Sequence, residues 1–506
     1  MPRLSLYPAS RYIPLFVSLL LFAVLSHYFF WQIGDDSYIY FRYVDRALAG
    51  KWWSYADYIP PVEGYSSPLW YLLLIALGKF GLGVEIASRS LGLLFATLTV
   101  LGCWQLARML KVSIVLSGFA CLFLVLNQGF HYWSSSGMES ALYMALLLYA
   151  CIGIVRGKYW LLPAALLAIA RPEGPFLLFA LTLAIAVFRR HYLSPTRLLL
   201  LWLPLACWLA LRWSIYGQLL PNTFYAKATG SLSQQLSSGL MYCLPVLLPL
   251  LLLWVFWFVR KSDEQKPQLL VVLGMISMLV GIVFLGGGDW MFHFRLLLPV
   301  LALLWVAVAH YWQHSAQGSR WALALCCSLL LLLSVTPKQL VAAMSTKQLP
   351  EEHYQEGLMT QQSLVLAEQL KTRYPVGTLL AVNHAGALPW ALLDYDVIDM
   401  VGLNDAHIAH GEGGLHQKYD ADYVLSLKPA FIVLNTRIKP GTDGIWYHPG
   451  YWVGETAVFE HADFAANYQA SDWPVQWQWQ IPFPYRLFVG KSDVTSWIVV
   501  YQRRTE

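Results

Sequence analysis

Long apolar runs alternate with short polar or basic loops from residue 13 to residue 336. A membrane-spanning helix needs about 20 apolar residues, and the first run, 13–33, has this length. Placing the loops rich in Lys and Arg on the cytoplasmic side predicts eleven spans. They are 13–33, 86–107, 112–130, 140–155, two short helices within 159–188, 197–216, 236–259, 268–286, 292–312 and 321–336. The run 68–82 is short and contains Lys79, so we expect it to be interfacial or re-entrant.

This threading predicts on which side each polar loop lies. The amino terminus is expected in the cytoplasm, and the region after the last span is expected outside. Every loop with unusual polar content then falls on the outer face, whereas the inner loops are short and basic. These outer loops are 34–67, 133–139, 171–174, 217–227 and 286–290. We therefore predict that the chemistry of this protein takes place on the outer side.

After residue 337 the pattern changes to that of a soluble domain. Residues 354–373 are predicted to form a helix. Short runs rich in β-branched residues follow, bounded by Gly, Pro and Asp, and they predict strands at 378–382, 397–401, 430–434 and 497–502. The sequence thus predicts a polytopic α-helical membrane domain, 1–336, followed by an extracytoplasmic mixed α/β domain, 337–506.

The composition agrees with this division. Hydrophobic residues make up 58% of the chain and charged residues only 12%, which is typical of a polytopic membrane protein and excludes a soluble enzyme. The net charge of +5 is small for this length and does not indicate a nucleic-acid partner. Bulky residues occupy 28–31, where a signal-peptidase site would need small ones, so the first span is expected to be an uncleaved anchor.

Two adjacent carboxylates, Asp35 and Asp36, follow the first span. Two like charges this close do not both ionise at their usual pKa, so the pair is predicted to act as a coupled acid/base unit. The same pair could hold a divalent cation. An alternative is a helix N-cap or an interfacial stop. Tyr38 and Arg42 share one face with Asp35 if a helix begins near Asp36, which would suit binding of a polyol and a phosphate. An amphipathic interfacial helix is the alternative for that stripe.

The later outer loops add further candidates. Glu63 is a third carboxylate, in a turn-rich segment. Lys227 ends the stretch 221–227, and Asp289 leads to His293 and Arg295 at the mouth of a span. Charges at the membrane boundary are costly and by default mark a substrate path. A departing phosphate needs cations, for which the candidates are Lys227, Arg295 and Arg171. Arg171 could instead form a structural ion pair with Glu173, and His293 could be a packed core residue.

Several of these segments, in this order, resemble the polyprenyl-phosphate-dependent GT-C membrane glycosyltransferases. The nearest group is that of the mycobacterial terminal arabinofuranosyltransferase and the bacterial pilin arabinosyltransferase. The segments are 35–43, Val62-Glu63-Gly64-Tyr65, Ser136-Gly137-Met138-Glu139, Arg171-Pro172-Glu173-Gly174, 221–227 with Asn222, and Gly287-Gly288-Asp289. Residues 383–386 and 398–405 resemble that group's extracytoplasmic domain. One departure is the aromatic stretch 51–55, where relatives tend to be rich in glycine.

The resemblance implies transfer of a sugar, with arabinofuranose as the best guess, from a polyprenyl phosphate donor. It implies that a first-loop aspartate is the catalytic carboxylate. We expect Asp35 to be the base and Asp36 to orient sugar hydroxyls or a metal ion, with an exchange of these roles as the alternative. The acceptor would be an extracytoplasmic glycan or a pilin-like protein, and the enzyme would sit in a bacterial inner membrane. The competing class is a transporter or flippase of a lipid-linked sugar. Transporters hold charges at mid-membrane and often show internal repeats, whereas here the charges cluster in outer loops and no repeat is evident.

Overall fold

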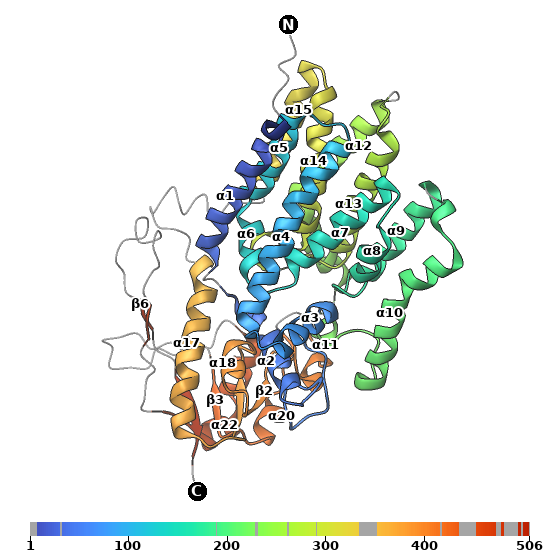
Figure 1. Cartoon of the computed structure of the whole chain (residues 1–506). Helices are drawn as coiled ribbons and strands as arrows, with labels where there is room; N and C mark the ends of the chain where they lie inside the picture. The colour runs from blue at the N-terminus through green and yellow to red at the C-terminus, as the bar shows by residue number, and fades with distance from the viewer. Residues whose placement is uncertain are drawn as a thin grey trace.

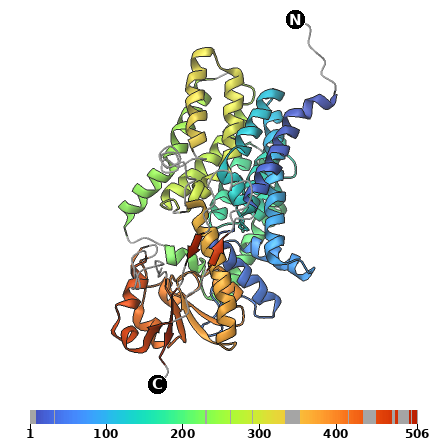
Figure 2. The same ribbon diagram turned by 90° about the vertical axis from the view of Figure 1, so that its left-hand side faces the viewer.

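The computed structural model describes most of the chain. The described residues are 8–30, 33–188, 190–227, 231–260, 263–289, 291–332, 352–414, 417–434, 452–471, 477–479, 494–496 and 499–504. They form two portions, which we name the helical portion, 8–332, and the α/β portion, 352–504. The α/β portion covers one end of the helical bundle, and α1 (Ile13–Phe29) begins at the other end (Figure 1). A view at right angles shows the same arrangement (Figure 2).

The helical portion follows the predicted apolar runs. After η1 (Pro8–Tyr12) and α1 come α2 (Asp35–Leu48), α3 (Pro68–Lys79), α4 (Val84–Met109), α5 (Ile114–Val125), α6 (Gln128–Ser135), α7 (Ser140–Arg156), α8 (Leu161–Leu167), α9 (Gly174–Phe188), η2 (Arg190–Tyr192), α10 (Pro195–Tyr216), α11 (Asn222–Lys227), α12 (Leu232–Val259), α13 (Lys266–Leu285), η3 (Phe292–Leu297), α14 (Leu298–His314) and α15 (Gln317–Leu332).

Six helices among the described residues are long and apolar enough to cross a membrane, and the pair α5 and α6, bent by 61°, could make a seventh span. The six contain α1, α4, α10, α12, α13 and α14. Shorter helices, α7, α8, α9 and α15, occupy the other predicted spans, and α8 has only 7 residues. A polytopic helical protein is therefore what the structure describes, and the count of eleven spans stays a prediction.

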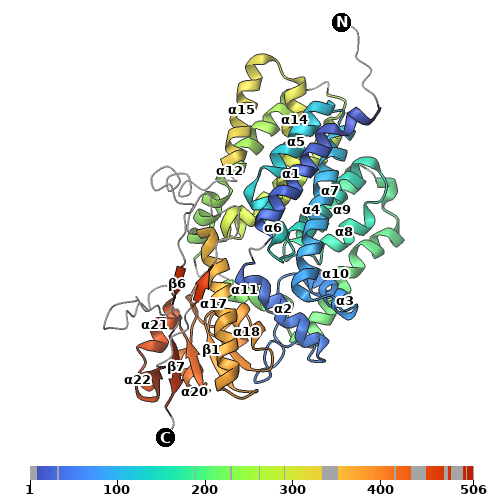
Figure 3. The ribbon, with the colours of Figure 1, turned by 60° about the vertical axis from the view of Figure 1, so that its left-hand side comes forward.

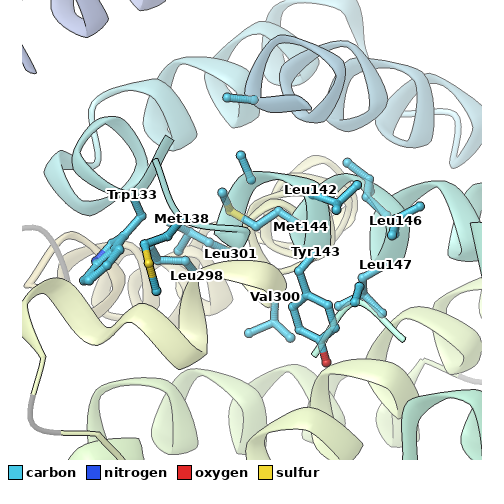
Figure 4. Close-up of a cluster of buried hydrophobic side chains, with 14 of the residues drawn as sticks. Trp133, Met138, Leu142, Tyr143, Met144, Leu146, Leu147, Leu298, Val300 and Leu301 are labelled. Carbon is cyan, nitrogen blue, oxygen red and sulfur yellow. The ribbon is translucent and has the colours of Figure 1, made fainter. Parts of the chain in front are cut away.

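The centre of the bundle is α14, packed against α4, α5 and α7. In the candidate span that contains α14, 89% of the residues are buried, against 17% in the span that contains α1. A helix that is apolar on all sides belongs inside a bundle, while one exposed on most sides faces lipid. Side chains of α7 and α14 meet in this core, among them Tyr143, Leu147, Val300 and Leu301 (Figure 4).

The α/β portion contains a five-stranded sheet of order β2-β1-β3-β7-β4. The strand β1 (Leu379–Val382) pairs in parallel with β2 (Asp396–Asp399) and β3 (Phe431–Val433), and β7 (Val500–Arg503) is antiparallel to β3 and to β4 (Tyr468–Ala470). A separate pair joins β5 (Trp477–Trp479) and β6 (Val494–Ser496). The helices are α17 (Glu352–Arg373), α18 (Ala387–Ala391), α19 (Ala406–Ala409), α20 (Ala421–Ser426), α21 (Val453–Phe459) and α22 (Ala462–Asn467).

These elements match the helix and the first three strands expected from the sequence. Of the fourth expected strand, residues 497 and 498 lie outside the described part, and β7 begins at Val500. The predicted domain boundary between residues 336 and 337 also lies outside the described residues.

The helix α2 joins the two portions. It begins after Gly34, whose backbone is extended, and the two aspartates in its first turn suit the positive end of a helix dipole. It lies between the bundle and the pair α17–α18 (Figure 3). Trp390 of α18 packs on Tyr38 at a ring-centroid distance of 5.0 Å, and its indole N–H donates to Asp45 Oδ2 over 2.7 Å. One hydrophobic core therefore runs from the bundle through α2 into the α/β portion.

Candidate active site

The first aspartate of the pair, Asp35, lies in the helical portion and binds the α/β portion. Its carboxylate accepts hydrogen bonds from the backbone N–H of Gly386, over 3.0 Å, and of Ala387, over 2.8 Å. Burial raises the pKa of Asp35, and the neighbouring Asp36 adds to this, whereas His384 and the two amides act in the opposite direction. A Cβ at Gly386 would stand 1.9 Å from the carbonyl oxygen of Asp35, so only glycine fits this junction.

The second aspartate, Asp36, is the member of the pair that faces a cation. Its side chain is 27% exposed and its Oδ2 lies 3.9 Å from Nη1 of Arg295. Asp36 therefore faces a cation, while Asp35 faces backbone amides. The two carboxylates predicted to act as a coupled acid/base unit thus have different surroundings.

Arg295 is the centre of a charged cluster just before the start of α14. Its Nε and Nη2 donate to Oδ2 of Asp289 over 2.9 and 2.8 Å, and its guanidinium lies 4.9 Å from the ring centroid of Trp133. Burial alone would raise the pKa of Asp289, but the charges of Arg295, Lys227 and Arg171 hold it below its usual range. The three cations predicted to bind a phosphate therefore all lower the pKa of one carboxylate, that of Asp289.

Arg171 has carboxylate partners of its own. It pairs with the buried Glu139, and its Nε donates to Oε2 of Glu173 over 3.1 Å. The ion pair with Glu173 that the sequence left open as an alternative is therefore present. Lys227, in contrast, is exposed and has no ion pair or hydrogen bond among the described residues.

His293 occupies a strained turn just before Arg295. Its φ is 57° and that of Phe294 is 50°, values that residues with a side chain rarely adopt. The His293 ring lies 5.6 Å from that of Tyr132, and a Cβ at Gly129 would meet the Cβ of His293 at 2.6 Å. His293 is 2% exposed, so it is a packed residue, as the alternative from the sequence expected.

Arg42 differs most from its predicted role. Its guanidinium is fully buried and donates to the carbonyls of Tyr55 over 2.9 Å, Leu392 over 3.0 Å and Tyr395 over 2.8 Å, and also to Pro389. A guanidinium whose donors are taken by backbone carbonyls cannot also bind a sugar phosphate. The prediction of Arg42 as a substrate residue is therefore wrong, because this residue fastens the α/β portion to α2.

Tyr38 and Asn222 are likewise occupied by structural contacts. The Tyr38 hydroxyl donates to Glu85 Oε1 over 2.6 Å, and the ring is 1% exposed. Asn222 donates from Nδ2 to the carbonyls of Gly402 and Leu403, both over 2.9 Å. Neither side chain lies open to a substrate in this arrangement.

Glu63 forms a buried ion pair that the sequence analysis missed. Its two carboxylate oxygens accept from Nε and Nη2 of Arg212, over 2.5 and 3.0 Å. Burial raises the pKa of Glu63 to about 7 even though Arg212 lowers it. The signal was available, since Arg212, well inside the apolar run 197–216, is costly unless it is paired.

Two residues of the α/β portion also lie near the site: His384, from the segment 383–386 noted in the sequence, and Lys418, which no motif marked. His384 lies within electrostatic reach of Asp35, and the Lys418 ammonium contacts the backbone of α11. Their positions depend on how the α/β portion folds and docks, which no local pattern records.

The surroundings of the pair do not fit the divalent cation predicted there. Both oxygens of Asp35 accept amide N–H groups, and Asp36 faces the guanidinium of Arg295. Hard cations need several oxygen ligands that are free to coordinate. Among the described residues, no group of three or more His, Cys, Asp and Glu side chains could hold a metal ion.

A helical bundle capped by an α/β portion, with charged loops between them, is the GT-C fold of membrane glycosyltransferases. The structure is similar to that of ArnT from Cupriavidus metallidurans bound to undecaprenyl phosphate, with 12% identity, coverage of 96% of this chain and 97% of that one, and a TM-score of 0.58. For the apo state of ArnT the identity is 13%, the coverage 98% of each chain and the TM-score 0.56. At such identities the likeness shows the fold.

The other comparisons are more limited. The arabinofuranosyltransferase AftD from Mycobacteria matches 99% of this chain and 40% of its own length at 13% identity, with a TM-score of 0.46, which is too low to bear on the sugar. Residues 348–500 match a family described as a domain of unknown function, DUF8728. No curated protein sequence is similar to this chain by direct comparison.

Proposed function

We propose that this chain is a glycosyltransferase that moves a sugar from a polyprenyl phosphate donor to an acceptor on the side of the membrane that holds the α/β portion. The observation that supports it best is the charged cluster just before the start of α14. There an accessible carboxylate, Asp36, stands 3.9 Å from Arg295, and the charges of Lys227 and Arg171 act on the neighbouring Asp289. A carboxylate beside several cations suits a reaction that takes a proton from a hydroxyl and releases a phosphate.

In the proposed reaction an acceptor hydroxyl oxygen attacks the anomeric carbon of the donor sugar. The bond from that carbon to the phosphate oxygen breaks, the polyprenyl phosphate leaves with both electrons, and the hydroxyl proton passes to Asp36. We assign the base to Asp36 because the Asp35 carboxylate already accepts two amide N–H groups from the α/β portion. One positioned carboxylate contributes about 10²–10⁴ in rate.

Lys227 and Arg295 are proposed to hold the departing phosphate. Lys227 is exposed at the end of α11, and Arg295 has a donor, Nη1, on the side of Asp36. Arg171 would not bind the phosphate directly, since its donors are engaged by Glu139 and Glu173. Its positive charge would still favour a phosphate at this site. Charge-assisted hydrogen bonds of this kind are the stronger ones, and the guanidinium can bind two oxygens at once.

The sugar and the acceptor are proposed from the sequence motifs. Arabinofuranose is the proposed sugar, and an extracytoplasmic glycan or a pilin-like protein is the proposed acceptor. The enzyme would lie in a bacterial inner membrane with its charged cluster facing outward. ArnT, which has this fold, was solved with undecaprenyl phosphate bound, which supports a polyprenyl phosphate as the carrier here.

The test is a comparison of cell-envelope glycans from cells that make the wild-type chain and cells that make Asp36→Asn in its place. Loss of one sugar from one glycan or glycoprotein in the variant would identify donor sugar and acceptor together. An exposed aspartate of the α/β portion supplies the matched control, Asp394→Asn. Unchanged glycans with Asp36→Asn, at wild-type protein levels, would contradict the proposal and favour a transporter or flippase.

A further inference from the structure

The short helix α11, which ends in Lys227, is held by the α/β portion. Asn222 at its start donates to the carbonyls of Gly402 and Leu403, over 2.9 Å each. Tyr225 stacks on His410, with 4.4 Å between ring centroids and 30° between planes. Among the described elements, α19 is the one on which α11 packs most closely. A helix of 6 residues is not stable alone, so these contacts set its position.

Lys418 forms the most unusual of these contacts. Its ammonium donates to the carbonyl of Tyr225 over 2.6 Å and to that of Ala409 over 2.9 Å. Both carbonyls lie in the last turn of a helix, α11 and α19, where carbonyl groups lack intrahelical partners. Lys418 thus ties the carboxyl ends of the two helices together.

Burying the Lys418 ammonium costs free energy, which only specific contacts can offset. The residue is 9% exposed, and among the described residues no carboxylate pairs with it. Burying an ammonium without a counter-ion costs free energy, and burial lowers the pKa of Lys418 accordingly. A Met or Leu would fill the same space without this cost. What the ammonium adds is a fixed distance between α19 and the backbone two residues before Lys227.

We propose that Lys418 is a positioning residue, which completes the donor-phosphate site from the α/β portion by fixing α11 and hence Lys227. This inference rests on the proposed function, in which Lys227 holds the polyprenyl phosphate. Lys418 does not touch the phosphate itself, because its donors are directed at two backbone carbonyls. Its effect on binding must therefore pass through Lys227. A displacement of about 1 Å in a binding group can cost up to 10²-fold in rate.

The experiment is a double-mutant cycle on the full-length protein in lipid nanodiscs, with undecaprenyl phosphate as the probe. The Kd is measured for the wild type, Lys227→Met, Lys418→Met and the double variant. We expect each single variant to bind about 10-fold more weakly, and the double variant to bind no more weakly than Lys227→Met alone. Losses that multiply in the double variant, or wild-type binding by Lys418→Met, would overturn the proposal.

Two further variants distinguish a positioning role of Lys418 from a general loss of folding. Lys371→Met is the matched control, since Lys371 is an exposed lysine of the same portion, paired only with Glu368. It should bind as the wild type does. Lys418→Arg retains donors for both carbonyls and should recover part of the affinity for undecaprenyl phosphate. If Lys418 only supported folding, every Lys418 variant would instead show a lowered Tm.

The proposed function and this inference fail in different ways. Sugar transfer by the wild type tests the function, and the binding cycle tests Lys418. A wild type that binds undecaprenyl phosphate but transfers no sugar contradicts the function alone, and the cycle still decides the role of Lys418. A wild type that does not bind the lipid phosphate overturns both.

Discussion

At the scale of single residues, two adjacent aspartates have separate environments. Asp35 accepts two amide N–H groups from the α/β portion, whereas Asp36 is partly exposed and faces Arg295. The sequence predicted the pair and its place at the end of a span. The sequence favoured Asp35 as the base, because it could not show that the amides of Gly386 and Ala387, more than 350 residues away, bind the Asp35 carboxylate.

The first prediction concerns this division of roles. Asp36→Asn should lower kcat by about 10²–10⁴-fold with little change in Tm, because it removes the proposed base and no contact between the portions. Asp35→Asn should lower Tm, because one amide N–H would then face a side-chain NH₂ group. Transfer assays and thermal melts of both proteins check this. The reverse pattern would assign the base to Asp35.

The second prediction concerns Asp399, a buried carboxyl at the end of β2 that accepts from the backbone N–H groups of Val401 and Asn404. Burial raises the pKa of Asp399 to about 6, although these bonds act against it. A raised folded-state pKa means that the fold favours the protonated form. Its stabilising contribution is complete below about pH 4 and is lost as the pH rises through about 6.

Asp399→Asn lacks this titration, so the wild type should lose stability relative to the variant between about pH 4 and pH 7, by about 2–3 kcal/mol. Thermal melts of both proteins across that range measure the change. The substitution itself alters hydrogen bonds, so only the pH dependence of the difference in Tm is informative. A difference that is constant with pH would contradict the raised pKa.

At the scale of elements, α10 is joined to the loop before α3 by the pair Glu63–Arg212. The apolar run that became α10 was visible in the sequence, because helix formation in a membrane depends on local composition. The partner of its arginine was not visible, since Glu63 precedes Arg212 by 149 residues. Elements were therefore predictable where the pattern is local, and ion pairs between elements were not.

The third prediction tests this pair. Arg212→Met leaves a buried carboxyl without its partner and should cost about 3–5 kcal/mol when Glu63 is ionised. Glu63 has a pKa of about 7 with Arg212 present, and without the cation its pKa rises further. The loss in Tm should therefore be smaller at about pH 5, where Glu63 is protonated, than at about pH 8.

Arg197→Met, in the same helix, is the matched control, since Arg197 contacts only Tyr192 among the described residues. It should change Tm little at either pH. The double variant Glu63→Gln with Arg212→Met should recover part of the stability, because no charge then remains buried. An equal loss for Arg212→Met at both pH values would contradict the titration of Glu63.

At the scale of the whole molecule, helices occupy the described parts of the apolar runs, the number of spans stays a prediction, and the charged cluster lies at the end covered by the α/β portion. The division into a helical and an α/β part could be predicted, because composition changes sharply along the chain. Their docking could not, since it depends on Arg42, Asp35 and Asn222 meeting backbone groups distant in sequence.

The fourth prediction is the orientation in the membrane. A reporter fused after Arg260 should be cytoplasmic, and one fused after Arg504 should be outside. Paired reporters active on opposite sides, such as a phosphatase and a fluorescent protein, check both positions. A cytoplasmic signal after Arg504 would contradict the threading and place the charged cluster on the wrong side for an extracytoplasmic acceptor.

The contacts of Arg42 also have a consequence for biosynthesis. Its guanidinium donates to carbonyls at residues 389, 392 and 395, about 350 positions later in the chain. A ribosome adds about 5–20 residues per second, so the loop 34–67 is made tens of seconds before these partners. During that interval α2 can pack against α3 and α4, but Arg42 and Asp35 lack their partners in the α/β portion. The proposed active site can therefore be completed only once residues 386–395 have been made, which would keep an unfinished chain inactive in the membrane.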